Sequence, residues 1–417
     1  QSAAAFGFDF RTAFKRNVYG NGYTLQAKTD LDDINDELER LWGVWCKKRN
    51  CDVTGMQSFS QIMRMCIDRK KVDGGILIVK VYTDQGFVPF QLQLFEVDEL
   101  YNDVFNKPQR GNKVVGGIEY NRYNRPVGYW IKQYDIDGIP IDPVYIEAKD
   151  VIFYASKRRP SQIREMSDMA PVLSRIRDTN EFITAVSVKQ RIEACLSVFI
   201  KKLQPSGTLG RTGGGEGNRK SYDGKTITPG MIRELNVGED VQVVNPSGQA
   251  TDSASFTKQL HRIIAAGMGI SYEASARDLS QTNYSSARQG AIEDEMTYAE
   301  EVELLMEVMD EIYETFVISC VLAGKVDIPG FWDNRDNYLN HIWVKAPKKW
   351  IDPQKEANAN KIALQTGQKT FKQIAGEQGR DWKEFIDEMV EPIEYAAELG
   401  LDLKQILYGI QPQQEVS

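Results

Sequence analysis

A helical repeat of apolar residues, from about Ser285 to Leu322, constrains the fold more than any other feature of the sequence. The repeat has apolar residues every three or four positions, the spacing that places side chains on one face of an α-helix. They are Ile292, Met296, Ala299, Val302, Leu305, Met309, Ile312, Phe316 and Cys320. Acidic residues lie between them, and no Lys or Arg occurs between Arg288 and Lys325. The pattern predicts one long helix with an apolar face and an acidic opposite face.

Shorter segments elsewhere in the chain predict a mixed fold. Helical periodicity also occurs at 31–46, at 58–71 with Ser58 as N-cap, at 168–200, at 253–270, and in the glycine-punctuated region from 350 onward. After the breaker at Asp73 to Gly75 the period changes to two, which predicts strands at 76–82, 90–97, 116–122, 127–134 and 150–155. Because turn signals separate these strands at short, even intervals, we expect an antiparallel sheet. The fold class is therefore α+β.

Residues 201–248 differ sharply from their surroundings. The segment is rich in glycine, and basic residues outnumber acidic ones between Lys201 and Thr226. A phosphate-binding loop would need a glycine five positions before Gly224, Lys225 and Thr226, and that position is Arg219. The sequence therefore favours an inserted basic module with a mobile surface loop over a nucleotide site.

Composition excludes several classes of protein. Charged residues make up 26% and hydrophobic residues 41% of the 417 residues, as in soluble globular proteins. No apolar run reaches the roughly 20 residues that span a bilayer, so we expect no membrane partner. The five cysteines form no CxxC pair and there are two histidines, which favours reduced thiols over a metal site. The net charge of -8 argues against a protein that grips nucleic acid over its whole surface.

The polar stretch Arg277–Gly290, RDLSQTNYSSARQG, lies between two helical regions. It is rich in hydroxyl side chains and holds two arginines, but it has no His, Cys or Glu that could serve as a base or metal ligand. No serine of the chain lies in a G-x-S-x-G frame. The end of the stretch leads into the long helix, so we expect Ser285 or Ser286 to cap that helix. The beginning is a candidate contact surface.

Four segments carry, in order, the sequence elements of a known family. They are residues 72–80 (VDGGILIVK), 159–200, 271–295 and 350–381. The N-Y-S-S-x-R element at Asn283–Arg288 is the most specific, and D-P-x-K-E-A at Asp352–Ala357 supports it. With these elements the chain resembles the portal proteins of tailed bacteriophages, specifically the lambda-type portal family, from about Tyr19 to Glu384.

The resemblance implies the portal-protein fold, which has a wing, a two-helix stem, a clip and a crown, and which assembles as a ring, usually a dodecamer. Along this chain the implied parts are a wing at 1–167, stem helices at 168–200 and 251–270, a clip at 201–250, a tunnel loop at 271–284, a long helix with a return to the wing at 285–349, and a C-terminal helical region at 350–417. Because the chain stops soon after residue 410, we expect a partial crown.

The resemblance also implies the partners. Double-stranded DNA would pass through the ring, driven by the terminase large subunit, and the major capsid protein and a head-tail adaptor would bind the ring. The protein would be part of the virion, assembled in the host bacterial cytoplasm, with no catalytic residue, metal or cofactor. Residues expected to face DNA are Arg277, Gln281, Thr282, Asn283 and Tyr284. Clip residues expected to contact terminase and then the adaptor are Arg211, Arg219, Lys220 and Lys225.

Two other functions stay open at this point. A protein-only head-tail adaptor would form no closed ring wide enough for a duplex. A metal-dependent nucleic-acid enzyme would use carboxylates of the acidic helix to bind metal ions. Such an enzyme would cleave nucleic acid with Mg²⁺ or turn over ATP, although the chain lacks a phosphate-binding loop for the second activity.

Overall fold

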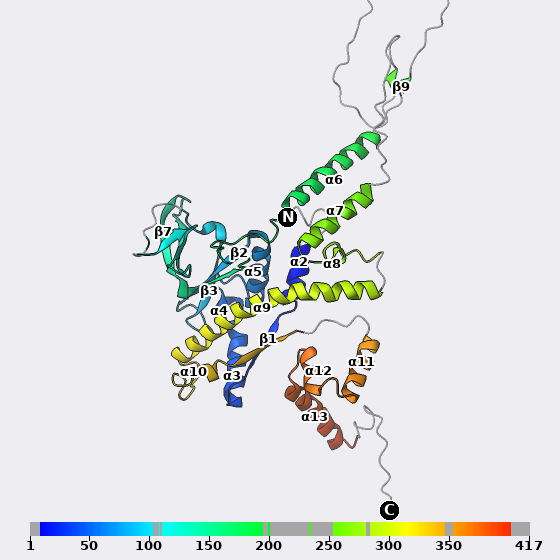
Figure 1. The fold of residues 1–417 in the computed structure, drawn as a ribbon. Helices are drawn as coiled ribbons and strands as arrows, with labels where there is room; N and C mark the ends of the chain where they lie inside the picture. The colour runs from blue at the N-terminus through cyan, green and yellow to red at the C-terminus, as the bar shows by residue number, and fades with distance from the viewer. Residues whose placement is uncertain are drawn as a thin grey trace, which may run out of the picture. The chain divides into compact units, whose positions relative to one another are not determined.

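The computed structural model describes residues 9–102, 108, 111–194, 199–200, 233–234, 253–280, 284–346 and 353–401. The chain forms two compact units (Figure 1). The first unit contains residues 1–10 and 171–290, and the second contains 11–170 and 291–417. Helices and antiparallel strands occur together in the described residues, so the predicted α+β class is confirmed.

The second unit holds most of the secondary structure. It begins at Arg11, within helix α2 (Phe10–Phe14), and continues with the π-helical turn η1 (Lys15–Tyr19). Its other helices are α3 (Asp32–Trp45), α4 (Lys48–Cys51), α5 (Phe59–Asp73), α10 (Arg335–Tyr338), α11 (Pro353–Gln365), α12 (Phe371–Glu377), α13 (Trp382–Glu398) and most of α9 (Tyr284–Leu322). Ser58 is the N-cap of α5, as predicted, and its N–H donates to Gln61 Oε1 at 2.8 Å.

The strands of the second unit form three antiparallel sheets. One sheet has the order β3 (Gln91–Glu96), β2 (Gly75–Val81), β8 (Val151–Ala155). Another follows chain order through β4 (Lys113–Val115), β5 (Ile118–Tyr120), β6 (Pro126–Tyr134) and β7 (Pro140–Glu147). The third pairs β1 (Tyr23–Ala27) with β11 (His341–Lys345). All five predicted strands are present, but they lie in two sheets, and β1, β4, β7 and β11 were not predicted. In β7 two prolines, Pro140 and Pro143, hide the strand pattern, and such residues fit an edge strand.

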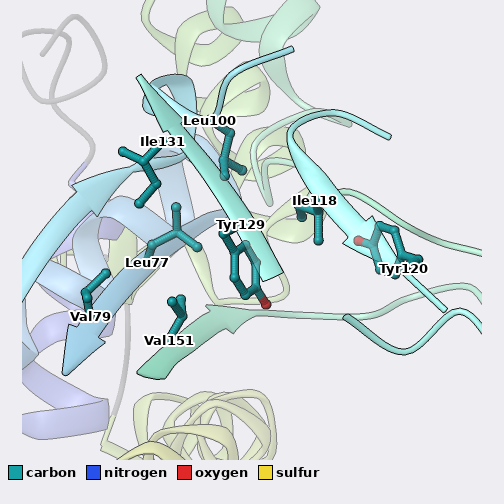
Figure 2. Packing of buried hydrophobic residues seen from close by; sticks show 8 residues of the cluster. All are labelled: Leu77, Val79, Leu100, Ile118, Tyr120, Tyr129, Ile131 and Val151. Carbon is teal, nitrogen blue, oxygen red and sulfur yellow. The ribbon is translucent and has the colours of Figure 1, made fainter. Parts of the chain in front are cut away.

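An apolar core joins the two larger sheets. Figure 2 shows Tyr129 of β6 close to Leu77 of β2 and Val151 of β8. The full cluster contains Leu77, Val79, Leu100, Ile118, Tyr120, Tyr129, Ile131 and Val151, none more than 5% exposed. Because Tyr129 and Ile131 are two residues apart on β6, a slip of one residue in strand register would remove both from this core. The core therefore fixes the register of β6.

An aromatic cluster joins α3, α5 and α9. The Trp42 ring lies 5.0 Å from Trp45, 5.1 Å from Phe59 and 5.2 Å from Phe316, measured between centroids. Trp45 stacks on Phe90 at 5.3 Å, and its Nε1–H donates to the Phe90 carbonyl at 2.8 Å. Aromatic pairs of this kind contribute about 0.5–1.5 kcal/mol each beyond the burial of their area. The cluster thus holds the later turns of α9 against two other helices.

Helix α9 begins one residue before the predicted start and ends at the predicted residue. Its apolar face is buried unevenly. Leu305, Ile312 and Phe316 are fully buried, whereas Ile292 is 51% and Met296 is 75% exposed. The difference follows from the aromatic cluster, which covers the later turns of the helix.

The first unit contains α6 (Leu173–Ala194), α7 (Ser253–Gly267) and the short α8 (Tyr272–Ala276). The helix predicted at 168–200 is therefore too long at both ends. Residues 168–172 precede α6, and β9 (Phe199–Ile200) pairs in parallel with β10 (Arg233–Glu234). The rest of the predicted basic module lies outside the described residues.

A buried cluster of ion pairs ties α5 to α9 and to the segment that ends at residue 170. Lys70 and Lys71, in the last turn of α5, are 0% and 4% exposed. Lys70 Nζ lies 2.8 Å from Glu301 Oε2, and Lys71 Nζ lies 2.8 Å from Asp168 Oδ2. Arg158 also pairs with Asp168. The pKa of Lys70 is lowered, because burial and the charge of Lys71 outweigh the opposing effect of the two carboxylates. Because buried charges need compensation, these pairs hold three distant segments together.

Gly74 provides a test of the packing at the end of α5. Its φ is +93°, and a Cβ there would lie 2.5 Å from the backbone carbonyl carbon of Met166. We expect Gly74→Ala to destabilise the fold by at least about 2 kcal/mol, because the left-handed conformation alone costs about 1–2 kcal/mol and the backbone near Met166 must also move. The urea unfolding midpoint would measure the loss.

The control for this change is Gly43→Ala, in the middle of α3. A Cβ at Gly43 meets no atom within 4 Å beyond the backbone of its own helix and its chain neighbours. Alanine there should stabilise the helix by about 0.5–1 kcal/mol and raise the urea midpoint. Equal midpoints for the two variants would contradict the packing described at Gly74.

Candidate nucleic-acid interface

Helices α6 and α7 form the frame of the candidate interface. They run side by side (Figure 1), and the ring of Phe182 meets that of Phe256 edge to face at 4.7 Å. Near the other end of α7, a Cβ at Gly267 would lie 2.3 Å from Val172 Cγ1. Glycine at that position therefore allows the close approach of the two chain segments.

The chain then turns twice within a few residues. Gly269 has a φ of +72°, and the Ile270 N–H donates to the Ala265 carbonyl at 3.1 Å, which ends α7. Ser271 caps α8, because its Oγ accepts from the Ala274 N–H at 3.2 Å. These local bonds set the starting point of the polar stretch.

Arg277 occupies an unusual backbone position at the end of α8. Its φ is +55°, and among the described residues Asn124 is the other non-glycine residue with a positive φ. The Arg277 N–H donates to the Glu273 carbonyl at 2.9 Å. A left-handed arginine costs about 1 kcal/mol or more, and strain of this kind gathers at functional sites. Arg277 is thus the left-handed C-cap of α8, and this conformation ends the helix.

The side chain of Arg277 is half exposed. Its Nη2 lies 3.7 Å from Asp9 Oδ2, and the Asp9 N–H donates to the Ser275 carbonyl at 2.8 Å. An exposed ion pair at this separation contributes little free energy. A phosphate group could replace Asp9 as the partner of Arg277 at low cost.

Asp278 organises the turn that follows. Its Oδ1 accepts from the Ser280 hydroxyl at 2.5 Å and from the Ser280 N–H at 3.0 Å, and its Oδ2 accepts from the Tyr272 hydroxyl at 3.0 Å. The Ser280 side-chain and backbone hydrogen bonds and the Tyr272 hydrogen bond lower the pKa of Asp278 to about 2. The carboxylate therefore stays ionised and shapes the turn at physiological pH.

Two basic residues of α7 flank the Tyr272 ring. Lys258 Nζ lies 5.2 Å and Arg262 Cζ 5.7 Å from the ring centroid. Lys258 also lies 3.7 Å from Asp278. The basic pair and the tyrosine were missed at the sequence level. A signal was present in the i, i+4 spacing of the two cations, which puts them on one helix face.

Several carboxylates of α9 serve the second unit itself. Glu301 pairs with the two buried lysines, Asp310 accepts from Trp343 Nε1–H at 2.7 Å, and Glu311 lies 2.7 Å from Lys80. Burial opposes ionisation of Asp310, but its hydrogen bonds to His341 and Trp343 lower its pKa. The acidic face is thus a mixture of structural ion pairs and exposed residues such as Glu303.

Comparison with known proteins decides the family. The model of "Phage portal protein, lambda family" matches residues 7–301. The chain belongs to the lambda family of phage portal proteins. The probable portal protein of Halomonas phage phiHAP-1 is 26% identical over 415 residues, which cover 94% of this chain and 78% of that protein.

Two further portal proteins match a shorter part of the chain. The portal protein of Escherichia phage N15 is 26% identical over 152 residues, 34% of this chain and 29% of its own length. Portal protein B of Escherichia phage lambda is 25% identical over 152 residues, 34% of this chain and 28% of its own length. A chain from the virion of a native gene transfer agent particle superposes with a TM-score of 0.41 and 13% identity, covering 90% of this chain and 94% of the other.

Only some of the predicted interface residues of this portal-family chain lie within the described residues. Arg277 is described above, whereas Gln281, Thr282 and Asn283 lie outside the described residues. Tyr284 is the first residue of α9. The clip residues, Arg211, Arg219, Lys220 and Lys225, also lie outside the described residues.

The predicted helix cap is wrong. Helix α9 begins at Tyr284, so Ser285 and Ser286 lie inside its first turn. An N-cap residue has a non-helical backbone and precedes the first helical residue, so neither serine can hold that position. The helix therefore begins at Tyr284, two residues before the first helical position that a Ser285 cap implies.

Two features of the described residues concern membranes and metal ions. No described helix of this portal-family chain has both the length and the apolar character needed to cross a membrane. The described part of the chain also contains no group of three His, Cys, Asp or Glu side chains placed to hold a metal ion.

Asp278→Asn should loosen the turn at residues 277–280. We expect faster amide hydrogen exchange at Ser280 near neutral pH, because the amide that replaces the carboxylate is a weaker acceptor. Because the folded pKa of about 2 lies below the ordinary value of about 3.9, the contribution of the carboxylate is complete above about pH 4 and is lost as the pH falls through about 2. The wild-type protection should approach that of the variant over this range.

The control is Asp142→Asn on the exposed edge strand β7. It should leave exchange at Ser280 unchanged at every pH. A Ser280 protection factor that is the same in wild type and Asp278→Asn would contradict the turn geometry.

Proposed function

We propose that this chain forms a ring at one vertex of a phage capsid and acts there as a passive conduit for double-stranded DNA. The observation that carries the proposal is membership of the lambda portal family, whose model spans α6, α7, α8 and the polar stretch. The ring would be a dodecamer, and DNA would enter through it during packaging and leave through it during ejection.

The chemistry around Arg277 supports a sliding contact. A protein that neutralises many phosphates binds DNA tightly, because it releases many counterions. A conduit needs few and exchangeable contacts. Arg277 is held by one long, half-exposed ion pair to Asp9, and the chain as a whole carries a net charge of -8. Salt confines the repulsion from that charge to about 8 Å, so the wall of the tunnel discourages sticking without blocking passage.

The parts of the portal fold follow the order of the chain. We assign the wing to residues 1–167, the stem to α6 and α7, the clip to 201–250, the tunnel loop to 271–284 and the start of the crown to 350–417. Two of the three borders between the compact units, at residues 170–171 and 290–291, support a stem, clip and loop that are separate from most of the wing, whereas residues 1–10 group with the first unit. Arg277, Gln281, Thr282, Asn283 and Tyr284 would then face DNA.

The proposed partners of the ring are proteins as well as DNA. The clip residues Arg211, Arg219, Lys220 and Lys225 would contact the terminase large subunit during packaging and a head-tail adaptor afterwards. The basic character of the clip supports such a docking role, since charge complementarity speeds and orients association. The major capsid protein would surround the ring in the virion. ATP hydrolysis would belong to terminase, and this chain would catalyse no reaction.

Electron microscopy of the purified chain tests the proposed assembly. We expect closed rings with a central opening wide enough for a B-DNA duplex. Closed rings without such an opening would favour a protein-only adaptor. Mg²⁺-dependent cleavage of DNA by the purified chain would favour the enzyme. Monomers under all conditions of salt and concentration would overturn the ring.

Asn283→Ala combined with Tyr284→Ala tests the DNA-facing residues. Procapsids should assemble normally, but fewer should retain DNA, because the loop would lose polar contacts without losing the ring. The number of DNA-filled heads in an in vitro packaging reaction measures the effect. Tyr123→Ala, at a turn where the side chain is 72% exposed, is the control and should package normally. Normal packaging by the double variant would place the DNA contact elsewhere.

A further inference from the structure

A cleft in the second unit, lined in part by charged side chains, lies outside the candidate interface. Its volume is about 510 Å³, within the range of small-ligand sites. The residues that line it are Thr12, Lys15, Arg16, Gly20, Asn21, Arg64, Met65 and Asp68. They come from α2, the π-helical turn η1, the loop after it, and α5. Three lining residues are cationic and one is acidic, in a chain that is acidic overall.

The single carboxylate of the cleft is already neutralised. Asp68 accepts from Arg11 Nε at 2.6 Å, Lys15 Nζ lies 3.4 Å from its Oδ1, and Arg69 Nη2 lies 3.3 Å from its Oδ2. Although burial opposes ionisation, the Arg11 hydrogen bonds and the charge of Lys15 lower the pKa of Asp68. The Asp68 carboxylate is therefore ionised and contacts several cationic side chains. Because it is the one acidic group of the lining, the cleft keeps an excess of positive charge.

Arg64 is held in place before any ligand binds. Its Nη2 donates to the Gly20 carbonyl at 3.0 Å, and its guanidinium carbon lies 5.4 Å from the centroid of the Tyr19 ring. Tyr19 is buried, and its hydroxyl hydrogen-bonds to Ser60 Oγ at 3.0 Å, so the ring is a rigid support. A stacked arginine loses little side-chain entropy when it binds an oxyanion.

The turn after η1 shapes the rim of the cleft. Gly20 has a φ of +61°, and its N–H donates to the Lys15 carbonyl at 2.9 Å. A Cβ at Gly20 would lie 3.0 Å from the Arg16 carbonyl oxygen. The glycine thus lets the chain fold back tightly and keeps Lys15 and Arg16 beside the same opening. Arg16 is exposed there.

We propose that this cleft binds phosphate groups, either those of a nucleic-acid backbone or those of a free polyphosphate. Guanidinium groups match phosphate oxygens in geometry as well as charge. Arg16 of η1 and Arg64 of α5 supply two such groups to the lining of the cleft. Lys15 adds a compact charge, and the Asn21 amide adds a neutral donor. The inference does not rest on the ring, because all of these residues belong to one compact unit of one chain.

Titration of the full chain with pyrophosphate and with a short DNA duplex tests the proposal. Arg16→Ala removes an exposed guanidinium, and Arg64→Lys keeps the charge but removes the planar fork. For each probe that binds the wild-type chain, we expect either change to raise the Kd at least about tenfold at low salt. For duplex DNA, the slope of log K against log salt concentration should fall by about one for each lost phosphate contact.

Arg122→Ala is the matched control, an exposed arginine beside Tyr123 on the turn between β5 and β6. It should leave the affinity for both probes unchanged, and thermal unfolding should show that all variants fold. Binding of both probes would indicate a general phosphate site, and binding of the duplex alone would indicate a nucleic-acid backbone site. Failure of both probes to bind, equal affinities for wild type and the two cleft variants, or binding of a glutamate-rich peptide in place of phosphate would each overturn the proposal. None of these results depends on whether rings form.

Discussion

The buried pairing of Lys70 and Lys71 with Glu301 and Asp168 is the interaction on which the second unit most depends. An ammonium group removed from water costs several kcal/mol unless a carboxylate compensates it. Here the carboxylates lie 97 and 231 residues away from the lysines that they meet. The last turn of α5 can therefore be buried only because α9 and the segment before residue 170 supply the carboxylates that compensate its two lysines. A loss of either carboxylate would leave a charge buried without a partner.

The aromatic cluster and the ion pairs stabilise different parts of α9. Its later turns are held by Trp42 and the neighbouring aromatic rings, and Glu301 is held by the lysines of α5. Its first turns carry Ile292 and Met296 in exposed positions. Residues 284–290 of the same helix belong to the first unit, so one continuous helix takes part in both units. The N-Y-S-S element thus leads from the polar stretch into the longest helix of the described residues.

Sequence patterns found the helices and missed several residues of the candidate interface. The period of α9 and the Ser58 cap of α5 were predicted correctly, because both depend on residues within a few positions of each other. Ser285 and Ser286 were wrong as caps, because several polar residues in a row offered equally good starts and the backbone decided among them. The cations that flank Tyr272 were missed, because the turn through Gly269 that brings them to the ring has no periodic signature.

By itself, the sequence determined the α+β class, the approximate bounds of the long helices and of five strands, and the family. These properties follow from local periodicity and from short ordered motifs, which do not depend on distant contacts. Tertiary structure decided that the five strands divide between two sheets, that Asp168 and Glu301 neutralise a buried lysine pair, and that Arg16 and Arg64 line one cleft. The physical reason is that charge pairing and sheet membership are set by residues far apart in the chain, whose meeting depends on how the whole unit packs.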